Sequence, residues 1–267
     1  MIEFLQYGFM QRAFIAGILT ALLCAVIGVF LVLRRMSLIG DGLAHISFGG
    51  IAAGMLFGIY PLLSALVFSV LAALGIQKLK RMKVYGDAAI AIFFSFGLSI
   101  GVVIVSMAHG FNADLFSYLF GSILAVSGAD ILLVLVVGIA TLAMLYLFYK
   151  ELFYITFDEE SARAAGIPVE RLNNLLVVLT AITVVLSLRI VGILLVSSFI
   201  VIPASTALLF SRGFRQAIAV SALIAVASVI LGLVLAYYFD LAAGGAIVLV
   251  LVAAFASGLL IKNMHAG

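Results

Sequence analysis

Charged residues are scarce in this chain. Of its 267 residues, 9% are Asp, Glu, Lys or Arg, whereas soluble domains average about 25%. Hydrophobic residues make up 67%, and the mean hydropathy is +1.41. So much apolar surface with so little polar cover would not stay soluble. The composition predicts a polytopic membrane protein with no large aqueous domain, and it leaves no folded basic face for nucleic acid.

Two further absences narrow the functional classes. Cys24 is the one cysteine, so no disulfide can form within the chain, and its side chain is expected to be a small buried apolar group. No lysine follows a glycine, so the phosphate-binding loop that ends in Gly-Lys-Ser/Thr is absent. The chain is therefore not expected to be an enzyme, and ATP-driven transport would require a separate ATPase subunit.

Apolar runs recur along the whole chain. About 20 residues of helix cross the hydrocarbon core of a membrane. Nine runs approach or exceed this length, and we expect them to form one transmembrane domain over residues 1–267. The less apolar segment 109–130 leaves room for a short or re-entrant helix. The predicted spans cover residues 14–33, 38–60, 61–77, 88–108, 131–149, 173–188, 191–209, 217–239 and 245–261.

The distribution of Lys and Arg predicts how these spans are oriented. If the N-terminus lies outside and the spans alternate, 12 of the 14 Lys and Arg residues fall inside, and Arg12 and Arg189 fall outside. Cytoplasmic loops of membrane proteins carry such an excess of positive charge. The sequence therefore predicts an all-α membrane protein with its N-terminus outside and its C-terminus inside.

An acid and an imidazole stand out inside the second predicted span. Asp41 and His45 are four residues apart, so they share one face of a helix. Ionisable residues within a span are costly and usually functional. At about 1.5 Å per residue, they lie roughly 9 Å and 15 Å beyond Arg35 along the helix axis. Carboxylate oxygen and imidazole nitrogen suit Zn²⁺, Mn²⁺ or Fe²⁺, and two ligands suit an ion that must leave again.

The Asp–His pair alone leaves three interpretations open. It could contact a divalent metal ion in transit, form a structural hydrogen-bonded pair that braces two helices, or relay protons. Glycines at four-residue spacing in the same span, Gly50, Gly54 and Gly58, predict close packing on one side. A centrally packed helix can hold a polar face away from lipid.

The charged inside segment, residues 150–172, predicts a short helix between two spans. Asp158 can cap its N-terminus, the two glutamates that follow favour the positive end of the helix dipole, and Gly166 ends it. This helix is either a solvated surface element or a docking element for a cytoplasmic partner, with small side chains such as Ala162 on its exposed surface. The candidate docking residues are Asp158, Glu159, Glu160, Ala162, Arg163 and Gly166.

Four blocks of sequence, in this order, resemble the integral-membrane permease subunits of bacterial ABC importers for zinc, manganese and iron. The set in order is far more specific than any single block, and the length and order fit over essentially the whole chain. The blocks are RRMSLIGDGLAH at residues 34–45, LFGSIL at 119–124, FDEESARAAG at 157–166 and VGILLVSSFIVIPA at 191–204.

The resemblance implies a permease in the bacterial cell membrane that imports a divalent metal ion by alternating access. It implies a homodimer of permeases, two cytoplasmic ABC ATPase subunits and an extracytoplasmic metal-binding protein. It also implies that Asp41 and His45 contact the ion, and that the helix around residues 158–166 docks the ATPase. The transported metal would be zinc, manganese or iron, and no permanently bound cofactor is expected.

Several alternatives remain at this point. His109, Asn112 and Asp114 lie on the predicted outer face, where they either guide an incoming ion or form a solvated polar loop. The rival functions are a permease for a metal chelate or cofactor, and a proton-coupled secondary transporter that needs no ATPase. An intramembrane enzyme is disfavoured because the pair lacks a second aspartate or a nucleophile.

Overall fold

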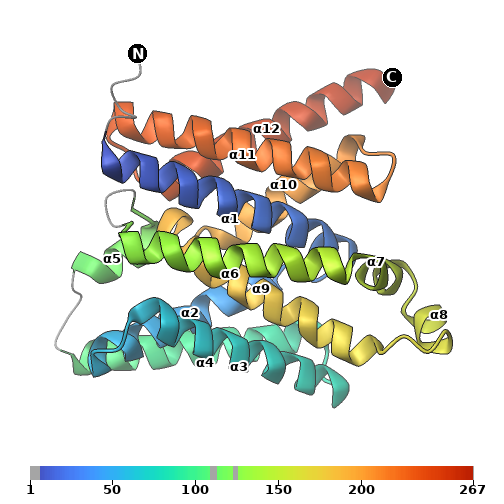
Figure 1. Cartoon of the computed structure of the whole chain (residues 1–267), viewed down its shortest axis with the longest axis horizontal. Helices are drawn as coiled ribbons and strands as arrows, with labels where there is room; N and C mark the ends of the chain where they lie inside the picture. The colour runs from blue at the N-terminus through green and yellow to red at the C-terminus, as the bar shows by residue number, and fades with distance from the viewer. Residues whose placement is uncertain (1–6, 109–112, 123–125, 267) are drawn as a thin grey trace.

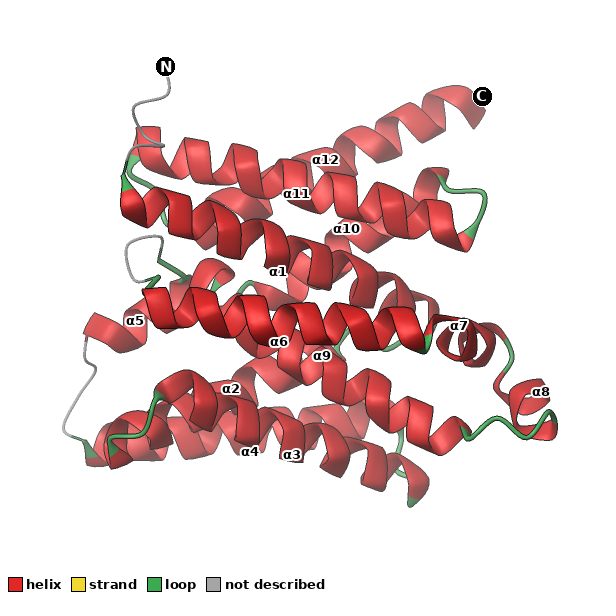
Figure 2. Cartoon of the chain, viewed as in Figure 1, coloured by secondary structure: helices red, strands yellow, loops and turns green. Residues whose placement is uncertain are grey.

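A computed structural model describes residues 7–108, 113–122 and 126–266. All regular secondary structure in these ranges is helical (Figure 2). Figure 1 shows the long helices side by side in one bundle, with α5 at one end and α7 and α8 at the other. The helices are α1 Gly8–Leu33, α2 Ile39–Phe57, α3 Pro61–Arg81, α4 Gly86–Met107, α5 Ala113–Phe120, α6 Gly128–Leu147, α7 Tyr149–Phe157, α8 Glu159–Ala164, α9 Val169–Val191, α10 Val196–Phe210, α11 Phe214–Phe239 and α12 Ala243–Ala266.

The predicted all-α architecture with about nine spans is confirmed. Eight described helices are long and apolar enough to cross a membrane, and α10 is a shorter apolar helix of 15 residues. α1 begins at the α5 end of the bundle and α12 ends towards the opposite end, as an odd number of crossings requires (Figure 1). The segment 109–130 contains a short helix, α5, as the sequence allowed.

The starts of two spans differ from the prediction by five residues or more. α1 begins at Gly8, six residues earlier than expected, because the charged side chain of Arg12 is accommodated within the helix: its Nε donates to the Val126 carbonyl at 3.1 Å. α10 begins at Val196, five residues later than expected, because Gly192 ends α9 in the left-handed region at φ 88°.

The joint between α9 and α10 packs against the end of α5. The Ile193 amide donates to the Tyr118 carbonyl at 2.9 Å, and the Ser122 amide donates to the Arg189 carbonyl at 3.1 Å. A Cβ on Gly192 would lie 2.5 Å from the Leu119 carbonyl oxygen, so only glycine fits this approach. The described part of the block at 119–124 therefore meets the block at 191–204 in space.

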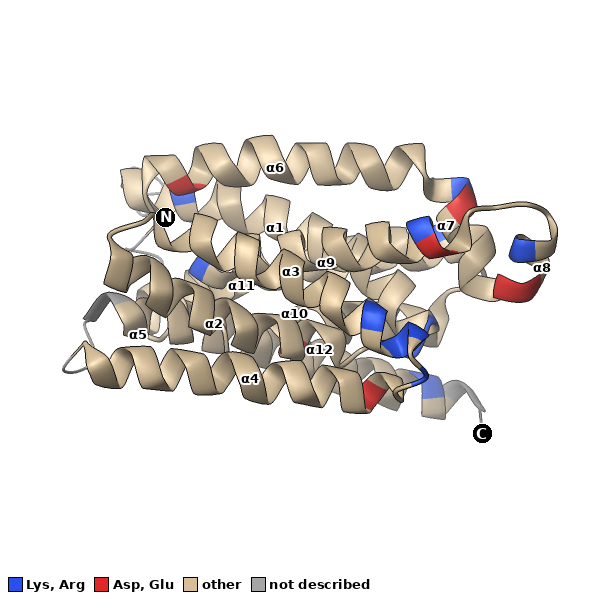
Figure 3. Ribbon diagram, turned by 90° about the horizontal axis from the view of Figure 1, so that it is seen from below, with Lys and Arg blue, Asp and Glu red and all other residues tan. Residues whose placement is uncertain are grey.

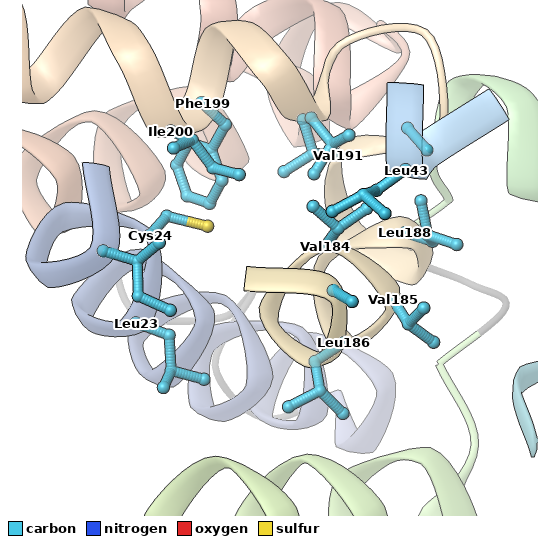
Figure 4. Packing of buried hydrophobic residues seen from close by; sticks show 14 of the residues in the cluster. Leu23, Cys24, Leu43, Val184, Val185, Leu186, Leu188, Val191, Phe199 and Ile200 are labelled. Carbon is cyan, nitrogen blue, oxygen red and sulfur yellow. The ribbon is translucent and has the colours of Figure 1, made fainter. Parts of the chain in front are cut away.

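Three helices form the buried centre of the bundle. In α1, α2 and α9, 67–78% of the membrane-spanning window is buried, compared with 28–39% in α3, α4, α6, α11 and α12. Figure 4 shows apolar side chains from the central helices and α10 facing one another, including Leu23, Leu43, Val184 and Phe199. Cys24 is fully buried among them, as predicted, with its Sγ 3.2 Å from Ser187 Oγ.

The glycines of α2 confirm the predicted close packing at two of three positions. A Cβ on Gly50 would lie 2.7 Å from Ala65 Cα, and one on Gly54 would lie 3.0 Å from Pro61 Cα, so α3 packs directly on this face. Gly58 instead ends α2 in the left-handed region at φ 67° and has open space around it. The prediction that Gly58 packs against a neighbouring helix was wrong, because the helix stops there.

Basic residues gather at one end of the bundle. Figure 3 shows most Lys and Arg segments at the end that carries α7 and α8. Arg12 and Arg189 lie at the opposite end, where they contact the loop before α6 and the first turn of α6. This separation agrees with the distribution expected for a cytoplasmic end at α7 and α8.

Candidate functional site

Asp41 and His45 lie in the first two turns of α2, the most buried span in its membrane window. His45 Nδ1 and Asp41 Oδ1 are 3.8 Å apart, so the structure brings the predicted pair together on one helix face. The positive N-terminal end of α2 favours a carboxylate at this position. The start of α10 packs against the same turn, since a Cβ on Gly40 would lie 3.8 Å from Ser197 Oγ.

The orientation of His45 leaves one ring nitrogen available as a ligand. Its Nδ1 lies 3.0 Å from the Asp41 carbonyl oxygen, which can only accept a hydrogen bond, so this contact favours the neutral tautomer that carries its proton on Nδ1. In that tautomer Nε2 has a lone pair, as a metal-binding imidazole requires. The ring also packs on Phe94 of α4 at 4.1 Å between centroids, which fixes its plane. The His45 side chain is 13% exposed and the Asp41 side chain 39%.

The geometry disfavours a pair that braces two helices. The polar contacts of Asp41 and His45 run between the two residues, and both belong to α2. Within the described residues, no group of three or more His, Cys, Asp and Glu side chains could hold a metal ion. Asp41 and His45 thus place one carboxylate and one imidazole at a single partly open position, and two potential ligands would suit passage of an ion better than permanent storage.

The predicted cytoplasmic helix exists with the expected caps. Asp158 Oδ1 accepts from the Ser161 amide at 2.9 Å, and this hydrogen bonding lowers the pKa of Asp158, which keeps the cap charged. At the other end, Gly166 adopts φ 80° and the Ile167 amide donates to the Ala162 carbonyl at 3.1 Å. This pattern is the glycine-based helix stop that the sequence predicted.

The candidate docking residues on α8 have two different environments. Ala162 is fully buried, so the expectation that its side chain lies on the exposed surface was wrong; it anchors α8 to the bundle instead. Glu159 also faces the bundle in part, with its Oε2 3.1 Å from Arg34 Nη2 and its Oε1 3.5 Å from Asn173 Nδ2. The remaining face is open and forms a groove of about 690 Å³ lined by Glu159, Glu160, Arg163 and Ala164.

The ion pair between Arg34 and Glu159 connects two sequence blocks that are 125 residues apart. Arg34 directly follows α1 and is 10% exposed in its side chain. It stands seven residues before Asp41, so α8 is joined through one ion pair to the segment that leads into the Asp–His pair. No local pattern predicts this pairing, because Arg34 and Glu159 are 125 residues apart in the chain.

A second polar cluster at the opposite end was missed by the sequence analysis. Asp130 is 1% exposed, its Oδ1 accepts from the Tyr60 hydroxyl, and its Oδ2 lies 3.4 Å from Arg189 Nε. Asp130 and Ser127 also form a capping box at the start of α6. The Arg189 guanidinium packs over the Tyr118 ring at 4.2 Å. The cluster ties the ends of α3, α5, α6 and α9 together, and the Ser-x-x-Asp pattern is the local signal that could have revealed its centre.

We expect Asp130→Asn to destabilise the protein by about 3 kcal/mol or more, because Arg189 would be left partly buried without its counter-charge. Thermal unfolding of the purified protein in detergent measures the change. Asp240→Asn is the matched control, since Asp240 is exposed and Asn tolerates its left-handed backbone conformation. An unchanged unfolding midpoint in Asp130→Asn would show that the cluster contributes little to stability.

Comparison with known proteins identifies the family of this chain. The chain matches the model of the ABC 3 transport family over residues 6–262. The chain belongs to the ABC 3 transport family. This confirms the resemblance that the four sequence blocks indicated, and it identifies the chain as a component of a transport system.

Relatives of this ABC 3 family member are named as metal transport proteins. It is 35% identical over 255 residues to the manganese transport system membrane protein MntC of Halalkalibacterium halodurans, covering 95% of this chain and 87% of that protein. It is 39% identical over 243 residues to a probable metal transport system membrane protein of Treponema pallidum, covering 90% and 91%. The fold of the present chain matches the structure of PsaBC from Streptococcus pneumoniae in complex with Fab, with a TM-score of 0.87 and 35% sequence identity. The match covers 96% of this chain and 93% of the matched chain.

Three predicted residues on the opposite face stay untested. His109 and Asn112 lie outside the described residues. Asp114 falls within α5, but its side chain is also outside the described part. Their proposed role in guiding an ion remains a prediction.

Proposed function

We propose that this chain is the permease subunit of an ATP-binding-cassette importer that carries a divalent metal ion, manganese or zinc, into the cytoplasm by alternating access. The observation that carries the proposal is the Asp41–His45 pair, held in the most buried span of an ABC 3 family member. The manganese named in its relatives supports that metal as cargo. Membership of this family does not favour a proton-coupled carrier.

The ion would pass the pair during the switch between outward-open and inward-open states. Asp41 supplies a carboxylate oxygen and His45 supplies Nε2, which is free because Nδ1 is engaged by a backbone carbonyl. ATP binding and hydrolysis on separate subunits would move α8. The Arg34–Glu159 ion pair would carry that motion to the joint between α1 and α2, and so to the pair.

Further subunits complete the proposed transporter. A carboxylate that is 39% exposed within a membrane-spanning bundle is costly if it faces lipid, so the open face of Asp41 should meet protein or a water-filled path. A second copy of this chain would cover that face and bring a second Asp–His pair to complete the coordination shell. Two ATPase subunits at α8 and an extracytoplasmic metal-binding protein at the opposite face complete the assembly.

Metal accumulation in cells tests this function. The chain is expressed with its ATPase and binding protein in a bacterium that lacks its own manganese and zinc importers, and cellular metals are measured by mass spectrometry. We expect manganese or zinc to rise in cells that carry all three subunits. Unchanged levels of every divalent metal, with all subunits shown to be present, would overturn the proposal.

A large, positively charged side chain on the open face of α8 should weaken docking of the ATPase. Ala164 is exposed and lines the groove, so Ala164→Arg is expected to lower co-purification of the ATPase by on the order of tenfold without unfolding the bundle. Lys262→Glu is the control, because Lys262 is also exposed near the same end but lies on α12. Full recovery of the ATPase with Ala164→Arg would argue against docking at α8.

A further inference from the structure

A groove lies between α7 and the turn that joins α10 to α11. In Figure 1, α7 is seen nearly end-on while the spans run across the view, so it crosses the end of the bundle. The groove has a volume of about 630 Å³. We call it the α7–α11 groove, and its lining residues are Tyr149, Lys150, Phe153, Arg212, Gly213, Phe214, Arg215 and Gln216.

The α7–α11 groove is positively charged. Lys150, Arg212 and Arg215 are exposed, and no acidic residue lines the groove. Among the described residues, none of these three cations forms an ion pair. Three uncompensated cations around one concave surface favour an anionic ligand.

The start of α11 adds a second, independent feature for binding an anion. α11 has 26 residues, its N-cap is Gly213, and no side chain caps it. Its first turn contains no acidic residue. The Ala217 amide donates to the carbonyl of the N-cap residue Gly213 at 2.9 Å and so makes the first hydrogen bond of the helix. No earlier carbonyl of the helix can accept from the three amides before it, those of Phe214, Arg215 and Gln216. Free amides and the positive helix end form the kind of site that binds phosphate groups.

The floor of the groove is aromatic. The Phe214 ring lies 5.1 Å from Phe153 and 5.9 Å from Tyr149, between ring centroids. Aromatic side chains of this kind are enriched where a membrane meets water. At the adjoining end of α6, Tyr146 is 83% exposed and Leu147 is 69% exposed, so an apolar surface leads from the bilayer side towards the groove.

We propose that the α7–α11 groove binds the phosphate headgroup of an anionic phospholipid of the cytoplasmic leaflet. Lys150, Arg212 and Arg215 neutralise the headgroup, the first-turn amides of α11 bind its phosphate oxygens, and the acyl chains lie on the exposed surface of α6. Basic pockets between spans on the cytoplasmic side bind anionic headgroups in this way. The proposal rests on the orientation proposed above but not on which metal is transported.

Native mass spectrometry of the purified full-length chain tests lipid binding. The probes are dioctanoyl phosphatidylglycerol, dioctanoyl phosphatidylcholine and inorganic phosphate. We expect the phosphatidylglycerol to bind, and the phosphatidylcholine and free phosphate to bind at least tenfold more weakly. The double variant Arg212→Gln/Arg215→Gln should weaken phosphatidylglycerol binding by about 25-fold, at roughly fivefold per basic residue. Lys262→Gln, a cation outside the groove, should bind within about twofold of the unsubstituted chain.

Four results would overturn the proposal. Equal binding of phosphatidylcholine, or an unchanged affinity in the double variant, would remove the headgroup contact. Inorganic phosphate that binds as tightly as the lipid would leave only a free-anion site. Loss of lipid when the ATPase is added would show that the groove is a protein contact. If the double variant does not fold, Lys150→Gln replaces it, with an expected loss of roughly fivefold.

Discussion

Asp41→Ala is expected to reduce the rate of metal uptake by about 100-fold or more while the bundle stays folded. The substitution removes the one carboxylate at the pair and leaves His45 as a single ligand, and losing a charged ligand worth about 2.7 kcal/mol corresponds to this factor. Stability should change little, because the Asp41 side chain is 39% exposed and, among the described residues, forms an ion pair with His45 alone. The initial rate of uptake of radioactive manganese into cells measures the effect.

Two controls keep the Asp41 experiment specific. Asp240→Asn removes the charge of an exposed acid at the opposite end of the bundle and keeps a side chain that tolerates the left-handed backbone there, so it should leave uptake within about twofold of the unsubstituted chain. Co-purification of the ATPase with Asp41→Ala should be unchanged, which separates loss of ion contact from loss of assembly. Normal uptake by Asp41→Ala would mean that the pair is not on the path of the ion.

Gly97→Val is expected to force α2 and α4 apart and to abolish uptake. A Cβ on Gly97 would lie 2.4 Å from Ile46 Cα and 2.8 Å from Ile46 N, so it would meet backbone that no side-chain rotation can move away. A Cβ on Gly49 of α2 would in turn lie 2.8 Å from the Gly97 carbonyl, so the two backbones touch here from both sides. The contact lies next to His45, whose ring packs on Phe94 of α4.

The expected cost of Gly97→Val is more than about 3 kcal/mol, at the upper end of what overpacking causes. Thermal unfolding in detergent and uptake in cells are measured on the same variant. Gly86→Ala is the matched control on α4, since its Cβ would meet only the flexible Lys80 side chain at 3.7 Å, and it should unfold and transport as the unsubstituted chain does. A folded, fully active Gly97→Val would contradict the close crossing of α2 and α4.

The sequence predicted the features that depend on neighbouring residues. The face shared by Asp41 and His45 follows from helix periodicity alone, and the Asp158 cap and the Gly166 stop follow from local backbone chemistry. The number of spans follows from apolar run length, because each span must satisfy the same membrane thickness.

The remaining features depend on partners far away in the chain. Asp130 lies 70 residues from Tyr60 and 59 from Arg189, and nothing in its own segment points to either. The burial of Ala162 depends on how α8 folds back onto the bundle, which a short helical pattern does not encode. The late start of α10 depends on Gly192, whose close approach to α5 is a tertiary contact.

ATP dependence of transport in a reconstituted system tests the central claim most directly. The permease, its ATPase and its binding protein are placed in proteoliposomes, and manganese and zinc entry is followed with and without ATP and with the proton gradient collapsed. We expect entry of one of these ions to require ATP and the ATPase, to persist without a proton gradient, and to disappear with Asp41→Ala. Entry that follows the proton gradient and needs no ATPase would contradict this account.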